Sequence, residues 1–118
     1  MSQRSPITTH VLDTALGRPA EGIGVRLERQ IGGDADGFEE IARGVTNADG
    51  RVADLLAAGS LSPGTYRLTF ETGAYLDRTG RAGFYPHVPV VFRIERTDEH
   101  YHVPLLLSPQ GYSTYRGS

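Results

Sequence analysis

Three histidines and one arginine are the side chains of this chain with the greatest capacity for chemistry. His100 and His102 lie two residues apart, His10 lies in an early apolar run, and Arg51 follows the turn-forming residues 47–50. A neutral imidazole with a pKa near about 6.5 can take part in proton transfer, and a guanidinium can bind anionic or carbonyl groups. The combination favours acid–base chemistry on an oxygen-rich ligand.

Each of these side chains also has an ordinary structural role that its position allows. His100 lies next to two acidic residues in a predicted turn, so we expect it to be a solvated surface residue. His102 lies inside an apolar run, where an imidazole needs a hydrogen-bond partner unless it serves in proton transfer. For His10 and Arg51 the residues alone leave both roles open.

The histidines also permit a metal site. Residues two apart on a strand project to the same side, so His100 and His102 can share a zinc ion with His10 as a third ligand. No further ligand motif accompanies them, and the chain has no cysteine, no Gly-rich phosphate loop and no serine nucleophile motif. We therefore expect no metal, no other cofactor and no covalent catalysis.

The segment at the C-terminal end has an unusual composition for a chain terminus. Residues 112–118 are Tyr-Ser-Thr-Tyr-Arg-Gly-Ser, rich in residues that favour β-strands. Most termini fray. We expect instead an ordered last strand over residues 112–116, with Arg116 available to bind anionic or carbonyl groups.

The elements that must position these residues are short strands. Apolar and polar residues alternate in runs separated by Gly, Asn, Asp and Pro, which are turn formers. The runs are residues 7–13, 24–31, 38–46, 65–71, 88–96, 100–108 and 112–116. Seven or eight strands at this spacing predict an all-β antiparallel sandwich.

Alternation also assigns faces to the two strands that carry histidines. In the run that ends at residue 108, the predicted core face consists of Tyr101, Val103, Leu105 and Leu107. His102 lies on the opposite face. In the first run, His10 lies on the face opposite Ile7 and Val11, so it can point toward solvent or a partner subunit.

Two segments can form a short helix. Residues 72–80 have Thr72 as a possible N-terminal cap and Gly80 as a stop. Residues 54–59 have better helix propensity but span little more than about one turn, so we expect a turn or loop there.

Length and charge restrict the class of protein and its partners. A chain of 118 residues is the common size of one domain with one core. Twelve basic and 14 acidic residues give a net charge of -2, which does not favour nucleic acid or an anionic membrane as partner. No secretory signal and no window approaching about 18 apolar residues is visible, so we expect a cytoplasmic protein.

Several motifs carry a family resemblance. They are Thr9-His10-Val11-Leu12-Asp13-Thr14, residues 17–20, residues 46–51, Phe84-Tyr85-Pro86, residues 100–109 and the terminal Tyr115-Arg116-Gly117-Ser118. With these motifs the chain resembles the 5-hydroxyisourate hydrolases, the transthyretin-like enzymes of urate degradation, along nearly its whole length. The Tyr-Arg-Gly-Ser terminus separates these enzymes from the hormone-carrying transthyretins.

The resemblance implies a fold, an assembly and a reaction. The fold is a single transthyretin-like hydrolase domain over residues 1–118, a transthyretin/prealbumin-like β-sandwich of two four-stranded sheets with one short helix, at residues 72–80. The assembly is a homotetramer with active sites at the dimer-dimer interface. The reaction is the metal-independent hydrolysis of 5-hydroxyisourate to 2-oxo-4-hydroxy-4-carboxy-5-ureidoimidazoline in purine degradation.

The same resemblance implies roles for individual residues. The catalytic residues would be His10, Arg51, His102 and Ser118, and the substrate-binding residues His10, Arg51 and Tyr115. Which histidine acts as the base stays open. Gln110 stands where many members have an aromatic residue or Gly, so we expect a different rim of the site but the same reaction.

Two other functions are consistent with the sequence. One is a non-catalytic transthyretin-like carrier of a small ligand, although a carrier has no chemical need for His10, His102 and the tail. The other is a prealbumin-like structural module, which residues 17–27, 47–50 and 62–68 also resemble.

Overall fold

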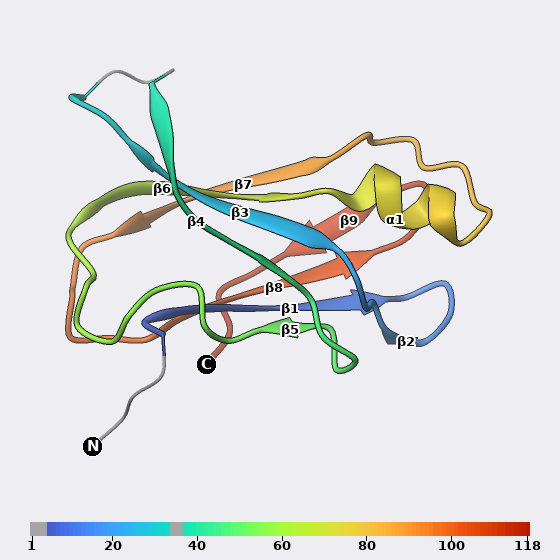
Figure 1. The fold of residues 1–118 in the computed structure, drawn as a ribbon, viewed down its shortest axis with the longest axis horizontal. Helices are drawn as coiled ribbons and strands as arrows, with labels where there is room; N and C mark the ends of the chain where they lie inside the picture. The colour runs from blue at the N-terminus through green and yellow to red at the C-terminus, as the bar shows by residue number, and fades with distance from the viewer. Residues whose placement is uncertain (1–4, 34–36) are drawn as a thin grey trace.

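Two β-sheets packed face to face, with a short helix at one end, make up the structure of residues 5–33 and 37–118 in a computed structural model (Figure 1). The strands and the helix are β1 (Ile7–Asp13), β2 (Arg18–Pro19), β3 (Gly24–Gln30), β4 (Phe38–Val45), β5 (Arg51–Val52), β6 (Gly64–Phe70), α1 (Thr72–Arg78), β7 (Val88–Ile94), β8 (Tyr101–Leu107) and β9 (Tyr112–Thr114). The predicted all-β sandwich with one short helix is therefore confirmed.

The two sheets differ slightly in strand number. One has the order β4-β3-β6-β7, and the other has the order β2-β1-β8-β9 with the two-residue β5 also paired to β1. The second sheet thus has five strands rather than the expected four, because the chain that follows the turn at residues 47–50 lies against β1 before it leaves the sheet.

Strand direction departs from the antiparallel expectation at one place. β1 and β8 run parallel, from Ile7 beside Tyr101 to Asp13 beside Leu107, while the other strand pairs are antiparallel. Alternation of residue types determines which face a side chain occupies, but it carries no information about the direction of the neighbouring strand. The parallel pairing brings the two histidine-bearing strands side by side.

The core lies between the sheets and follows the predicted alternation. Tyr101, Val103, Leu105 and Leu107 of β8 are all buried, as expected, and so are Ile7, Thr9 and Val11 of β1. They pack with apolar side chains of the facing sheet, including Leu27, Tyr66, Leu68 and Phe70. Each large apolar side chain buried in this way contributes about 1.5–3 kcal/mol to folding. The alternate side chains of β1 and β8 are thereby held on the outer face.

The helix forms in the segment for which the sequence predicts it, residues 72–80. α1 occupies Thr72–Arg78, residues 54–59 form a loop, and Gly80 follows the helix end with a φ of +74°. The expected cap at Thr72 is wrong, because the N-cap is Glu71 and Thr72 is fully buried against the core. Within residues 5–33 and 37–118, no helix combines the length and the apolar character that crossing a membrane requires.

A buried carboxylate fixes α1 to the end of β1. The side chain of Asp13 is 1% exposed and accepts hydrogen bonds from the Tyr75 hydroxyl at 2.8 Å and from Nη2 of Arg81 at 2.6 Å. Burial acts to raise the pKa of Asp13, but the hydrogen bonds from Arg81 and Tyr75 outweigh it and hold the pKa below its ordinary value. This ion pair anchors the strand that carries His10.

Candidate functional site

Three of the predicted site residues form a row across the outer face of the sheet that contains β1 and β8; they come from β5, from β1 and from the segment after β9. The register places His10 between Arg51 of β5 and Pro104 of β8. The register of β8 with β9, carried one residue beyond Thr114, places Tyr115 opposite Pro104. Residues in register share a face, so Arg51, His10 and Tyr115 lie in one row.

A second row, two residues along the strands, contains the other predicted histidine. Thr8 of β1 lies beside His102 of β8, and His102 forms a β-bridge with Gly117 of the tail. The N–H of Gly117 donates a hydrogen bond of 2.8 Å to the carbonyl oxygen of His102. The chain end accordingly lies near the start of β8 in Figure 1. The expected ordered tail is therefore present, although β9 itself ends at Thr114.

The imidazole of His102 is held on two of its edges. On one edge, Nδ1 lies 2.9 Å from the Thr8 hydroxyl. On the other edge, a Cβ built on Gly117 would stand 2.6 Å from Cδ2 of the ring, closer than such atoms ever approach. Glycine is therefore the residue that permits the tail to pack here. The ring edge made of Nε2 and Cε1 is the part left for a ligand.

Arg51 is positioned by a turn that is hydrogen-bonded to β1. The side-chain carbonyl oxygen of Asn47 accepts a hydrogen bond of 2.9 Å from the N–H of Asp49, which closes an Asx turn, and a second one of 3.0 Å from the N–H of Arg51. Gly50 has a φ of +75°, and its carbonyl oxygen accepts a hydrogen bond of 2.8 Å from the N–H of Val11. The turn thus delivers an exposed Arg51 directly beside His10.

His10 and His102, which are both half-buried, have lowered pKa values. For His10, burial is the largest cause and the positive charge of Arg51 the second, and both outweigh the raising effect of Asp49. For His102, burial again comes first, followed by the charges of Arg51, His100 and His10. A pKa below the ordinary value of about 6.5 keeps both imidazoles neutral at pH 7.

The tail residues have different surroundings. Tyr115 is 57% exposed and Ser118 is also exposed, directly after the residue that packs on His102. Arg116 instead pairs with Glu99 at 2.9 Å, and its guanidinium lies 4.4 Å above the Tyr101 ring. Tyr115 is thus exposed in the row of His10, and Ser118 is exposed at the end of the chain, whereas Arg116 is held in intramolecular contacts.

His100 is not the solvated surface residue that the sequence predicted. It is half-buried, and its Nε2 lies 2.8 Å from the same Thr8 hydroxyl that contacts His102. The prediction considered the acidic neighbours of His100 in the sequence, but its partner lies on another strand. Thr8 and Gly117 are the residues with a place at the site that sequence reasoning missed. The shared face of Thr8 and His10 was the available signal.

The chemical capacity of the outer face follows from these side chains. Two neutral imidazoles can accept a proton or hold a water molecule, and a guanidinium can stabilise negative charge that develops on an oxygen. Within residues 5–33 and 37–118, no three His, Cys, Asp or Glu side chains are grouped so as to hold a metal ion. The face suits the addition of water to a carbonyl group.

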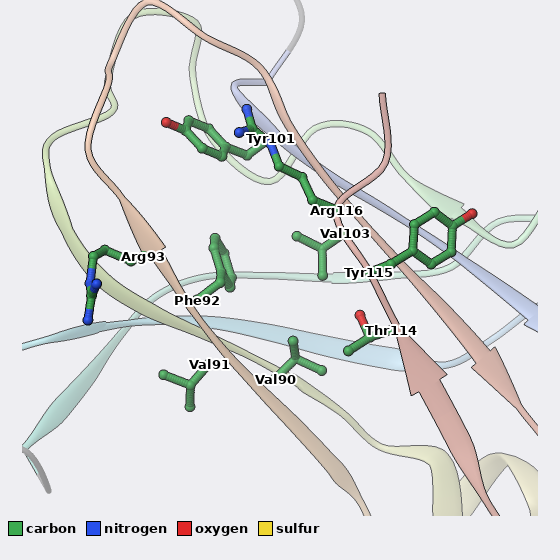
Figure 2. Close-up of a pocket in the computed structure, with 9 residues that line it drawn as sticks. All are labelled: Val90, Val91, Phe92, Arg93, Tyr101, Val103, Thr114, Tyr115 and Arg116. Carbon is green, nitrogen blue, oxygen red and sulfur yellow. The ribbon is translucent and has the colours of Figure 1, made fainter.

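A groove with a volume of about 220 Å³ lies elsewhere, between the β7 strand and the β8–β9 segment (Figure 2). Its lining consists of Val90, Val91, Phe92, Arg93, Tyr101, Val103, Thr114, Tyr115 and Arg116. In Figure 2 the Tyr115 ring is turned away from Val90 and Phe92. The side chains that line the groove include no His, Asp, Glu or Cys, so the groove lacks the imidazoles that the outer face carries.

Comparisons with known proteins agree with the geometry. The family model "Transthyretin: HIUase/Transthyretin family" matches residues 7–117. The chain is 48% identical to the 5-hydroxyisourate hydrolase of Mus musculus over 99% of this chain and 98% of that protein. The Klebsiella pneumoniae 5-hydroxyisourate hydrolase structure is similar, with a TM-score of 0.81 and 43% identity over 95% of this chain and 98% of that one. Sea bream transthyretin in complex with thyroxine has a TM-score of 0.87 and 33% identity, over 96% of this chain and 95% of that one. The chain belongs to the HIUase/Transthyretin family.

Proposed function

We propose that this chain hydrolyses 5-hydroxyisourate to 2-oxo-4-hydroxy-4-carboxy-5-ureidoimidazoline. The observation that carries the proposal is the placement of His10, Arg51 and His102 on one outer face, where a lowered pKa favours the neutral form of both imidazoles. The named relatives at 48% and 43% identity are hydrolases of this substrate. The side chains of the face supply the groups that such a reaction needs.

The proposed reaction adds water to a carbonyl of the six-membered ring and breaks the adjacent C–N bond. One imidazole takes a proton from water as its oxygen bonds to the carbonyl carbon. Arg51 binds the carbonyl oxygen, on which negative charge develops. The imidazolium then gives this proton to the leaving nitrogen as the C–N bond breaks, so that the ring opens to a carboxylic acid and a ureido group and the imidazole is neutral again. The acid releases its own proton to water and becomes the carboxylate.

The tail supplies further contacts in this proposal. Tyr115 lies in register with Pro104 in the same row as His10, so its hydroxyl can orient the substrate ring above the sheet. Ser118 follows the residue that packs on His102, and its hydroxyl is the candidate donor nearest the chain end. Gln110, which is exposed, contributes to the rim.

We also propose a homotetramer with its active sites at the dimer-dimer interface. Two features support assembly. In the described part of the chain, β7 and β9 are edge strands, and Val91 of β7 is 58% exposed. The proposed site lies on an open sheet face that a second pair of chains can cover. Sedimentation measurements test this, because a particle with the mass of a single 12.8 kDa chain would contradict it.

A ligand carrier is the alternative function, and the similarity to a thyroxine complex of transthyretin is the observation that favours it. The fold alone does not separate the two functions. Binding and turnover do: we expect the protein to accelerate the loss of freshly made 5-hydroxyisourate, with or without a metal chelator. A protein that binds a small aromatic ligand but leaves the decay rate unchanged is a carrier. A rate that disappears with the chelator contradicts the metal-independent reaction.

The cytoplasm stays the predicted location of the chain. Cell fractionation followed by the 5-hydroxyisourate decay assay tests it. Activity in the cytoplasmic fraction supports the prediction, and activity confined to another compartment contradicts it.

A further inference from the structure

One hydroxyl group lies between two imidazoles at the edge of the proposed site. The Oγ1 atom of Thr8 is 2.8 Å from Nε2 of His100 and 2.9 Å from Nδ1 of His102. All three residues are half-buried on the outer face, and the contacts join β1 to residues more than ninety positions later in the chain. Both distances are those of good hydrogen bonds.

The chemistry of a hydroxyl couples the protonation of the two rings. Thr8 has one proton to donate and lone pairs with which to accept. If it donates to Nε2 of His100, then Nδ1 of His102 must carry the proton that Thr8 accepts. In that arrangement Nε2 of His102 has a free lone pair. In the opposite arrangement Nε2 of His102 carries a proton and the ring cannot act as a base.

The surroundings of His102 favour the first arrangement. Gly117 occupies the Cδ2 edge of the ring, so the Nε2 and Cε1 atoms are the ones that face a ligand. Arg51 lies beside His10 in the neighbouring row of the same outer face, and a guanidinium can only donate hydrogen bonds. A lone pair on Nε2 is therefore more compatible with this neighbour than a second N–H.

We propose that Thr8 is a positioning residue, which, with His100 as its hydrogen-bond acceptor, fixes His102 as the Nδ1–H tautomer and so makes Nε2 of His102 the base. The inference rests on the proposed hydrolytic function and assigns the base within it. In serine hydrolases, a hydrogen-bond acceptor at Nδ1–H likewise fixes the tautomer of the catalytic histidine and leaves its Nε2 as the base.

Two variants of Thr8 separate orientation from packing. Thr8→Val keeps the branched shape but removes the hydroxyl, whereas Thr8→Ser keeps the hydroxyl. The chain has four histidines, so ring ¹⁵N shifts can be assigned with the help of His102→Gln. We expect the Nδ1–H tautomer of His102 in the unmodified protein and in Thr8→Ser, and a shift toward the Nε2–H tautomer in Thr8→Val.

Steady-state kinetics give the matching functional result. We expect kcat of Thr8→Val for 5-hydroxyisourate to fall about tenfold or more, because a misoriented partner of a catalytic group typically costs about 10–100-fold. KM should change less than about threefold, and Thr8→Ser should recover most of kcat. For the acceptor, His100→Gln can still accept from Thr8 and should keep more activity than His100→Leu.

The combined readouts decide the inference in each case. An unchanged His102 tautomer in Thr8→Val, or equal kcat in Thr8→Val and Thr8→Ser, overturns the role of Thr8. Equal kcat in the two His100 variants overturns the role of His100. If the unmodified protein does not accelerate the decay at all, the proposed function fails. The tautomer comparison still tests the orientation of the His102 ring, because it needs no activity.

Discussion

Gly117 lies against the imidazole of His102, and a Cβ at Gly117 would stand 2.6 Å from Cδ2 of that ring. The same residue donates its backbone N–H to the carbonyl oxygen of His102 at 2.8 Å. The tail is thus attached to the backbone of His102 and restrains its side chain. This contact explains physically why a glycine precedes the last residue of the Tyr-Arg-Gly-Ser terminus.

The first prediction concerns that contact. Gly117→Ala forces the His102 ring or the tail to move, and a displacement of about 1 Å at a catalytic group can cost up to about 10²-fold in rate. We expect kcat/KM for 5-hydroxyisourate to fall at least about tenfold. The free energy of unfolding should change little, because the tail is mostly exposed. Steady-state kinetics and urea unfolding measure the two effects.

Gly111→Ala is the matched control for this substitution. A Cβ at Gly111 meets no atom within 4 Å, and it lies just before β9. We expect its kcat/KM to equal that of the unmodified protein. Equal losses in the two variants would mean that the tail tolerates no added carbon anywhere and that the His102 contact has no special role.

The second prediction concerns His102 itself. Loss of a general base typically reduces a rate by about 10²-fold or more, so His102→Ala should lower kcat by at least that factor. His87→Ala is the control, because His87 is an exposed histidine that lies outside the proposed site. A His102→Ala protein with near-normal turnover would remove this residue from the mechanism.

The third prediction is the pH dependence of the rate. Burial and then the charge of Arg51 hold the pKa values of His10 and His102 below the ordinary value of about 6.5. Because a neutral imidazole is the form that accepts a proton, kcat/KM should reach its highest, constant value at about pH 8. It should decline at lower pH, with a midpoint below about 6.5. A profile that is flat from acid to neutral pH contradicts a histidine base.

Variants of Arg51 test whether its positive charge is what lowers the pH midpoint of the decline in rate. Arg51→Gln removes the positive charge that disfavours the imidazolium, so the midpoint of the decline should move to higher pH while kcat falls. Arg51→Lys keeps the charge and should keep the midpoint low. If the midpoint is the same in both variants, the charge of Arg51 does not act on the titrating histidine.

Several features of the fold and site could be predicted from the residues, and the others required the packed structure. Alternation placed His10 and His102 on the outer face because the side-chain period of a strand is local information. The contact of His100 with Thr8 could not be predicted in this way, because it depends on the parallel register of β1 with β8. Thr72 was assigned as a cap from its type, yet its burial in the core prevents that role.

The fourth prediction concerns the hydrogen bond from Tyr75 to the buried Asp13 at the end of β1. Tyr75→Phe removes the hydroxyl that donates to the buried carboxylate of Asp13, and a hydrogen bond to a charged group contributes about 1.5–3 kcal/mol. We expect the free energy of unfolding in urea to fall by about that amount. Tyr85→Phe is the control, because Tyr85 is 40% exposed. Equal stabilities of the two variants would show that the hydrogen bond from Tyr75 to Asp13 does not stabilise the fold.

The fifth prediction tests the central claim that the outer face and the tail form one hydrolytic site. The rate of decay of freshly made 5-hydroxyisourate is measured with the full chain and with a chain that lacks residues 115–118, after circular dichroism has shown that both are folded. The proposed site predicts rapid decay with the full chain and a rate close to the spontaneous one with the shortened chain. A folded, shortened chain that is fully active, or a full chain that does not accelerate the decay, would contradict it.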